Sequence, residues 1–203
     1  PHEATEILEL IAEQSRDMAD MVEDLLVAAR ADIGTVTIHP DVVYLRAQAE
    51  VAVASLGTEP PNTIDVVGGP GKAWADPTRT RQIIRNLLTN AVRYGGAMVT
   101  IEATTHGDAT VLTVSDDGPG LAEADWEKIF EPYVRAHERP TQPESVGLGL
   151  SVSRQLARLM GGDLTYHADD KGSVFQLTLP SRHPDETTGV QLDQPTMVSS
   201  QRG

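Results

Sequence analysis

Cysteine is absent from the 203 residues of this chain, which excludes disulfides and thiolate metal sites. Aromatic residues make up only 4% of the sequence, against 39% hydrophobic residues in total. A packed core therefore has to be built from aliphatic side chains. No apolar run approaches the length of a membrane span, and no signal peptide is visible. The sequence indicates a soluble protein or the soluble part of a larger one.

Basic residues are also scarce. Lysine and arginine together number 16 against 30 aspartates and glutamates, which gives a formal net charge of -14 and a pI near 4.7. Surfaces that bind nucleic acid or anionic membranes need clustered positive charge. We therefore expect no nucleic-acid partner and no membrane contact. The length suits one ordinary domain plus an appendage.

Residues 5–31 are predicted to form one long amphipathic helix. Apolar positions alternate four and three apart in a heptad seam made by Ile7, Ile11, Gln14, Met18, Met21, Leu25 and Ala28. One such helix cannot bury its own stripe. It either packs on its own domain or forms half of an antiparallel hairpin that dimerises into a bundle, and its length favours the hairpin. We assign residues 1–33 to this unit.

After residue 34 the hydrophobic period changes, and the chain reads as alternating short strands and helices. Strands are predicted at 35–38, 64–67, 72–75, 98–105, 110–115, 163–167 and 173–179, and helices at 41–55, 77–94, 123–130 and 151–160. Residues 68–71, Gly-Gly-Pro-Gly, lack the Lys-Ser/Thr of a phosphate-binding P-loop and are interpreted as a hairpin turn. We expect residues 34–181 to form the main domain and the polar residues 182–203 to be disordered.

Two places in this domain carry candidate chemistry. Asn86 and Asn90 are four apart and share one helix face, where buried amides need partners such as a metal or a polyphosphate. The strand at 110–115 leads into Asp116, which could accept a hydrogen bond from an exocyclic amine. Gly118 and Gly120 then permit positive φ and close approach of a flat ligand. Taken alone, this second pattern is more typical of a plain turn.

Four segments in register change that interpretation. Residues 85–94 (RNLLTNAVRY) resemble the N box of bacterial two-component sensor histidine kinases, and residues 116–120 (DDGPG) their G1 box. Residues 129–133 (IFEPY) resemble the F box, and residues 147–150 (GLGL) the G2 box. The order of the boxes and the elements that carry them also match. The resemblance implies the catalytic ATP-binding domain of the GHKL superfamily, an α/β two-layer sandwich of a mixed sheet and helices (the Bergerat-type ATP-binding fold).

The resemblance implies ATP and Mg²⁺ as ligands and gives residues their roles. Asp116 would accept a hydrogen bond from the adenine amine as a specificity residue, with Asp117 a solvated neighbour. Asn90 would be the Mg²⁺ ligand through its side-chain oxygen, supported by Asn86. Arg135 would meet the γ-phosphate in a loop, residues 131–146, that orders on nucleotide binding. The other residues implied to contact ATP are Arg93, Tyr94, Gly118, Gly120, Phe130, Ser145, Val146, Gly147, Leu148, Gly149 and Leu150.

Asn86 also distinguishes this chain from other GHKL proteins. Chaperones, topoisomerases, mismatch-repair ATPases and anti-sigma serine kinases of the superfamily resemble one another in having a glutamate at this place, which acts as general base. A neutral amide cannot accept a proton at pH 7. Transfer of the phosphoryl group to a histidine is therefore favoured over hydrolysis of ATP.

The chain departs from the family pattern in two places. The phosphoacceptor box is missing, because His2-Glu3 continues as Ala4-Thr5-Glu6 and no other histidine has the expected neighbours. Either the acceptor helix has been truncated away or it lies on another chain, and we expect the chain alone not to phosphorylate itself. Ser145-Val146 stand where the family often has Gly followed by Thr or Ser, and Val146 cannot donate a hydroxyl hydrogen bond to phosphate.

Three hypotheses follow from these observations. The first is the ATP-binding part of a cytoplasmic or membrane-bound sensor histidine kinase, acting in the cytoplasm as a homodimer and passing phosphate through a histidine to a response regulator. The second is a non-catalytic module that senses ATP and dimerises. The third is a serine kinase or ATPase of the same superfamily. The first is preferred.

Overall fold

The computed structural model describes residues 36–56, 62–134 and 147–185, and seven separate positions near the N-terminus: 11, 15, 18, 19, 22, 25 and 26. Those seven positions are helical, as predicted, and the other residues of the 5–31 segment lie outside the described part. Ile11, Met18, Val22 and Leu25 are all exposed. Among the described residues no helix is long and apolar enough to cross a membrane.

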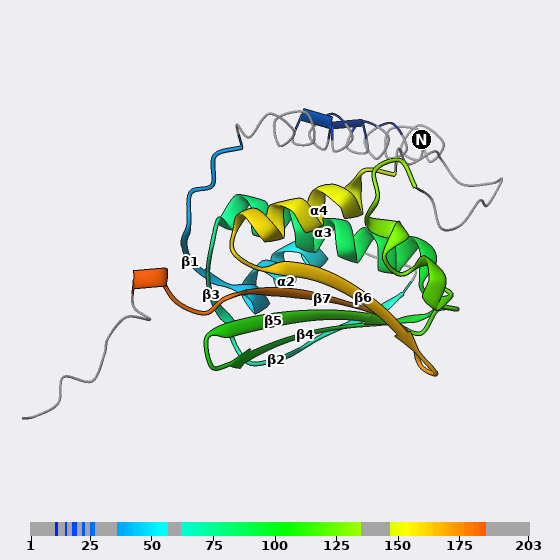
Figure 1. The fold of residues 1–203 in the computed structure, drawn as a ribbon. Coiled ribbons are helices and arrows are strands. Elements are labelled where there is room, and N and C mark those ends of the chain that lie inside the picture. Colours follow the sequence, from blue (N-terminus) through cyan, green and yellow to red (C-terminus); the bar gives the residue numbers. More distant parts are fainter. Residues whose placement is uncertain are drawn as a thin grey trace, which may run out of the picture.

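The main domain is built on a five-stranded mixed sheet (Figure 1). Its strands, in spatial order, are β2 (Thr63–Gly68), β4 (Met98–His106), β5 (Ala109–Asp116), β7 (Gly172–Pro180) and β6 (Asp163–Asp169). β2 and β4 are parallel, and every other pair is antiparallel. β7, the last strand in the sequence, thus lies inside the sheet between β5 and β6.

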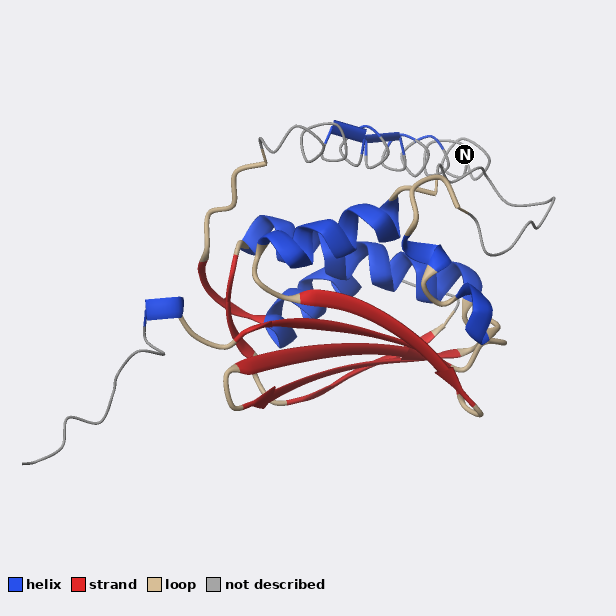
Figure 2. Ribbon diagram, viewed as in Figure 1, coloured by secondary structure: helices blue, strands red, loops and turns tan. Residues whose placement is uncertain are grey.

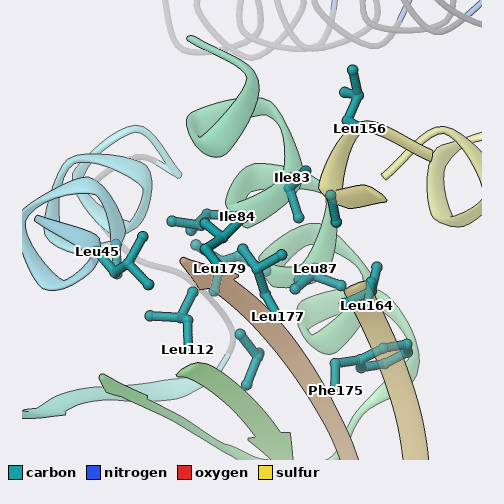
Figure 3. Packing of buried hydrophobic residues seen from close by; sticks show 14 of the residues in the cluster. Leu45, Ile83, Ile84, Leu87, Leu112, Leu156, Leu164, Phe175, Leu177 and Leu179 are labelled. Atoms are coloured by element: carbon teal, nitrogen blue, oxygen red, sulfur yellow. The ribbon is translucent and has the colours of Figure 1, made fainter. Parts of the chain in front are cut away.

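Three helices, α2 (Leu45–Ala54), α3 (Pro77–Tyr94) and α4 (Gly149–Leu159), cover one face of this sheet (Figure 2). Burial alternates along β5, where Leu112 and Val114 face the helices and are fully buried. The aliphatic core fills the space between the layers (Figure 3), and its central side chains are Leu45, Ile83, Ile84, Leu87, Leu112, Leu156, Leu164, Leu177 and Leu179. The predicted two-layer α/β architecture is confirmed.

The helix α3 starts where the sequence predicts. Asp76 is its N-cap, and the carboxylate of Asp76 accepts hydrogen bonds from the backbone N–H groups of Thr78 at 2.9 Å and Arg79 at 3.1 Å. Pro77 occupies the first turn, where its missing N–H costs nothing. The other carboxylate oxygen accepts from His39 N–H at 2.9 Å. Asp76 thereby fixes both the helix and the segment that enters the domain.

The prediction of a helix over 41–55 is wrong at its beginning. Asp41–Tyr44 form strand β1, which pairs antiparallel with β3 (Lys72–Ala75) in a separate two-stranded sheet. The Asp41 carboxylate accepts the next N–H, that of Val42 at 2.7 Å, and the N-cap position of α2 is Tyr44 instead. β-branched Val42 and Val43 suit a strand, and pairing with β3 decides the outcome.

The interpretation of residues 68–71 as a hairpin turn is also wrong. β2 and β3 belong to different sheets, and the glycine-rich segment crosses between them. Its carbonyls face the start of α2, because Gly71 O accepts from Leu45 N–H at 2.9 Å and Pro70 O from Arg46 N–H at 3.3 Å. The segment therefore satisfies the first N–H groups of a helix that has no side-chain cap.

Two smaller predictions also differ from the structure. Residues 36–38 have no regular structure, although a strand is predicted at 35–38. The predicted helix over 123–130 is two separate 3₁₀ turns, η1 (Glu123–Asp125) and η2 (Lys128–Phe130). After β7, near the C-terminal end of the described residues, Arg182 forms a 2.6 Å ion pair with Asp108, and the His183 ring packs edge-on against Trp74. Residues 186–203 lie outside the described part.

Candidate functional site

Asp116 lies at the end of β5, in the middle of the sheet, paired with Val99 of β4 and Ser173 of β7. It is 7% exposed. Its carboxylate accepts hydrogen bonds from Gly118 N–H at 2.9 Å and from the Ser173 side chain. Burial raises the pKa of Asp116, and the two hydrogen bonds act in the opposite direction. Asp116 is thus a buried carboxyl group that already accepts hydrogen bonds from Gly118 and Ser173.

The glycines near Asp116 are explained first by contacts within the protein. A Cβ on Gly118 would lie 2.7 Å from Asp116 Oδ1, and one on Gly95, after α3, would lie 2.8 Å from Asp116 Cγ. Gly120 has a φ of +63°, and a Cβ there would lie 3.0 Å from Ala168 Cβ on β6. These glycines allow the turn after β5 to pack between the end of α3 and β6.

Asp117 is not simply a solvated neighbour, as the sequence interpretation had it. Its side chain is exposed, yet Asp117 Oδ1 accepts from Met98 N–H at 2.8 Å, and its own N–H donates to Met98 O at 3.3 Å. Asp117 therefore fixes the start of β4 beside the turn that follows β5. Asp117 thus binds both backbone groups of Met98 and stabilises the contact between β4 and this turn.

The two asparagines lie one turn apart on α3, as predicted, and both are half-buried. Asn86 Nδ2 donates to Ser153 Oγ of α4 at 2.9 Å. A Cβ on Gly149, the first residue of α4, would lie 2.5 Å from Asn86 Oδ1. Asn86 therefore sits directly against the start of α4, and Asn90 lies one turn closer to Asp116. Arg93 and Tyr94, in the last turn of α3, are half-buried.

Residues 147–150 lead into α4 and contact the end of the F-box segment at Tyr133. Gly147, with a φ of +73°, accepts from Tyr133 N–H at 3.0 Å. Leu148 is 3% exposed and anchors the segment in the core, while Leu150 is half-buried. α4 has no side-chain N-cap, so the orphan N–H groups of its first turn are suited to an anion. Arg135, Ser145 and Val146, also predicted to contact nucleotide, lie outside the described residues.

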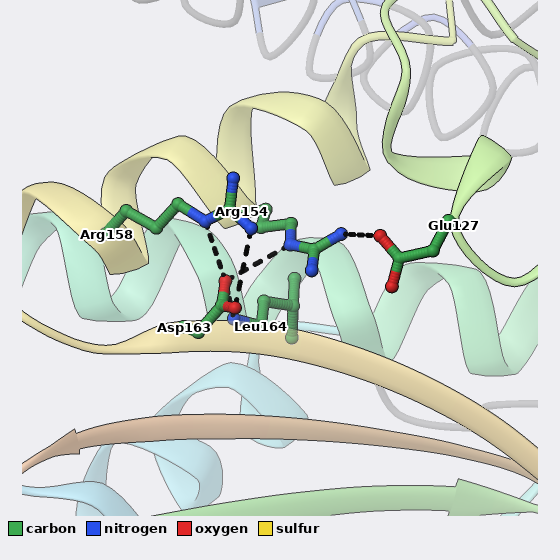
Figure 4. A network of polar contacts seen from close by, with 5 residues as sticks. All are labelled: Glu127, Arg154, Arg158, Asp163 and Leu164. Atoms are coloured by element: carbon green, nitrogen blue, oxygen red, sulfur yellow. Dashed lines mark hydrogen bonds and ion pairs between the residues drawn. The ribbon is translucent and has the colours of Figure 1, made fainter.

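Phe130 is buried beneath Arg154 of α4 (Figure 4 shows the network around this arginine). Arg154 donates to Glu127 Oε2 at 2.6 Å and to Asp163 Oδ1 at 3.1 Å. Asp163, at the start of β6, also accepts from Arg158 at 3.0 Å and from Leu164 N–H at 2.9 Å. Burial alone would raise the pKa of Asp163, but the hydrogen bonds from Arg158, Arg154 and Leu164 N–H together lower it.

The helix α3 connects the predicted base end and the predicted phosphate end of the site. Gly95 at its C-terminus touches Asp116, and Asn86, nine residues earlier, touches Gly149. At the helical rise of 1.5 Å per residue these points are about 14 Å apart. Such a spacing suits an elongated ligand with one group recognised at each end. Sequence reasoning missed Ser153, Ser173 and Tyr166 here, because only the strand order and the helix packing place them against these residues.

The structure is thus an α/β domain, in which three helices cover one face of a mixed sheet and a buried carboxylate stands at the end of the middle strand. Comparison with known proteins makes this specific. The family model of "Histidine kinase-, DNA gyrase B-, and HSP90-like ATPase" matches residues 75–183. The chain belongs to this family, as the four sequence boxes indicated.

Individual relatives agree with this assignment. The chain is 31% identical over 172 residues to the signal transduction histidine-protein kinase AfsQ2 of Streptomyces coelicolor, covering 84% of this chain and 32% of that protein. It thus spans about a third of this relative. Among solved structures, the histidine kinase AdeS of Acinetobacter baumannii has a TM-score of 0.71 at 19% identity, covering 87% of this chain and 84% of AdeS. Full-length ShkA in complex with AMPPNP gives 0.68 at 24% identity, covering 89% and 39%. These structural likenesses support the fold.

Proposed function

We propose that this chain is the nucleotide-binding catalytic part of a sensor histidine kinase. It binds Mg-ATP and donates the γ-phosphoryl group to a histidine, from which the phosphate passes to a response regulator. The observation that carries the proposal is the buried Asp116, held by Gly118 and Ser173 beside the C-terminal end of α3, while Asn86, near the middle of that helix, contacts the start of α4. The structural neighbour ShkA was solved with AMPPNP.

Asp116 recognises the adenine amine in this proposal. An ionised carboxylate only accepts hydrogen bonds, so it pairs with the exocyclic amine of adenine and rejects a base that carries a carbonyl there. This makes ATP the preferred nucleotide over GTP. Gly118 and Gly120 keep the turn beside the purine free of side chains, and Tyr94 and Arg93 in the last turn of α3 lie at the same end of the helix.

The phosphates then lie beside the middle of α3, near the uncapped start of α4, where Gly147 and Gly149 have no side chains to cover the backbone. Asn90 fits Mg²⁺, because its side-chain oxygen is a hard neutral ligand and this ion is usually held by few protein groups besides phosphates and water. When bound, Mg²⁺ neutralises phosphate charge. Arg135, Ser145 and Val146 remain proposed nucleotide contacts.

Asn86 supports phosphoryl transfer over hydrolysis. Its amide cannot act as a general base, and its nitrogen donates to Ser153 instead. Catalysis then rests on positioning and charge neutralisation. We further propose that the exposed apolar positions Ile11, Met18, Val22 and Leu25 belong to a dimerisation hairpin, so that the full-length protein is a homodimer acting at the cytoplasmic side.

The proposal is tested by titrating the chain with ATP in the presence and absence of Mg²⁺. We expect Mg²⁺-dependent binding that is lost in Asp116→Asn and retained in Asp117→Asn, which makes the same change on the adjacent carboxylate. Labelled phosphate should then reach a separately supplied hairpin that carries an acceptor histidine box. No binding of ATP would contradict the proposal. Steady release of phosphate without any acceptor would favour an ATPase, and binding without transfer would favour a non-catalytic ATP sensor.

A further inference from the structure

Tyr166 is a buried residue in the middle of β6, 7% exposed. Its ring packs at an angle against Phe175 of β7, with the centroids 4.8 Å apart, and edge-on against Trp126 at 6.1 Å. Three aromatic rings thus gather in a chain that has only eight aromatic residues (Phe, Trp and Tyr) in all. This cluster packs against the turn that follows β5. A Cβ placed on Gly120 in that turn would lie 3.7 Å from the Tyr166 hydroxyl oxygen.

The hydroxyl of Tyr166 joins two parts of the candidate site. It accepts a hydrogen bond from Leu121 N–H at 3.0 Å and donates to Ser173 Oγ at 3.2 Å. The Ser173 side chain in turn donates to the carboxylate of Asp116, its partner across β5 and β7. One chain of hydrogen bonds therefore runs from Leu121 through Tyr166 and Ser173 to Asp116.

The direction of each hydrogen bond in this chain is fixed by the number of protons available. A hydroxyl group has one proton to donate. Because an ionised carboxylate can only accept, Ser173 donates its single proton to Asp116. The Ser173 oxygen then accepts from the Tyr166 hydroxyl, which itself accepts from Leu121 N–H. The Asp116 carboxylate therefore accepts two hydrogen bonds within the protein, from Gly118 N–H and from the Ser173 hydroxyl. These two donors use only part of the acceptor capacity of the carboxylate, which offers about four acceptor sites.

We propose that Tyr166 is a positioning residue for base recognition, which orients Ser173 toward Asp116 and so presents the carboxylate as an acceptor for the exocyclic amine of adenine. This inference rests on the proposed function and adds to it a residue that none of the four sequence boxes contains. The second bond, to Leu121 N–H, holds the backbone immediately after Gly120 against β6. A phenylalanine at 166 would keep the packing against Phe175 and Trp126 but would lose both hydrogen bonds.

The test compares ATP with purine riboside triphosphate, which lacks the exocyclic amine. We expect the unsubstituted chain to prefer ATP, and Tyr166→Phe to lose about threefold to tenfold of that preference, the range for one neutral hydrogen bond. A purely structural defect would weaken both nucleotides equally. Tyr44→Phe, which removes the same atom from an exposed tyrosine on β1, is the matched control and should change neither affinity.

Two further measurements show whether Tyr166 acts through Ser173. In a Ser173→Ala background, Tyr166→Phe should have no additional effect on the ATP preference, since the intermediate oxygen is gone. ATP affinity should also fall on acidification as Asp116 protonates. Burial raises the Asp116 pKa, and the hydrogen bond from Ser173 lowers it. In Tyr166→Phe the Ser173 bond is weaker, so the Asp116 pKa is higher and the decline in ATP affinity should begin at a higher pH. The effect of the neighbouring Asp117 on this pKa is the same in both chains.

An unchanged preference for ATP in Tyr166→Phe, in a chain that itself discriminates between the two nucleotides, would overturn this inference and leave the proposed function intact. Equal binding of the two nucleotides by the unsubstituted chain would instead contradict adenine recognition by Asp116, and the role of Tyr166 with it. A loss of preference in Tyr166→Phe that persists at full size in the Ser173→Ala background would also overturn the assignment.

Discussion

The guanidinium of Arg154 lies over the ring of Phe130, with its carbon 4.5 Å from the ring centroid. The same guanidinium pairs with Glu127 and with Asp163. One side chain of α4 therefore holds together the 3₁₀ segment that carries the F box and the start of β6. In this way the end of the F-box segment keeps a fixed position relative to the helix whose first turn is proposed to meet the phosphates.

Arg154→Gln is expected to lower the free energy of unfolding by about 1–3 kcal/mol, because the arginine side chain is 13% exposed and its removal leaves Asp163 with one fewer donor. Glu127→Gln is the control, and it should cost less than about 1 kcal/mol since the Glu127 side chain is 81% exposed. Urea unfolding of both variants measures the difference. Equal losses in the two variants would show that Glu127, and not Asp163, is the important partner.

Stability should depend on pH through Asp163. Burial alone would raise its pKa, but hydrogen bonds from Arg158 and Arg154 bring the pKa below its ordinary value. The folded chain therefore holds this proton less tightly than the unfolded chain does. The stabilisation is present above the ordinary pKa of aspartate, near 3.9, and is lost as the pH falls through the lower folded value. Unfolding curves of Asp163→Asn should show a weaker decline in that acid range; a decline identical to that of the unsubstituted chain would contradict this role.

Gly149→Ala should weaken nucleotide binding even though alanine favours helix at this first position of α4. The added Cβ would meet Asn86 Oδ1 at 2.5 Å, so α4 or Asn86 must shift. We expect a loss of about 1–3 kcal/mol of stability together with reduced ATP affinity, measured by calorimetric titration and thermal unfolding. Gly69→Ala is the matched control, because the nearest atom there is 3.9 Å from the new Cβ. If Asn86→Ala in the same chain failed to restore stability, the clash would not be the cause.

Much of this domain could be predicted from residues that act locally. The cap Asp76-Pro77 and the 3.6-residue period of Ile83, Ile84, Leu87 and Leu88 predict α3, and the strand-like run at 111–114 predicts β5. The turn at 68–71 could not be predicted, because strand pairing, and not the glycines, decides that β3 joins β1. Asp41 failed as a helix cap for the same reason. Local signals identify a turn or a cap, whereas the partner of a strand depends on distant residues.

The sequence by itself determined the family, because four short boxes stand in order, and these boxes hold Asp116, Asn90 and Gly149 of the proposed site. The tertiary structure alone decided which residues support them. Ser173 and Tyr166 reach Asp116 only because β7 inserts between β5 and β6, and Ser153 reaches Asn86 only because α4 packs on α3. The boxes are encoded over a few consecutive residues. The supporting hydrogen bonds between Leu121 and Tyr166 and between Asn86 and Ser153 join residues 45 and 67 positions apart, and no local pattern can encode them.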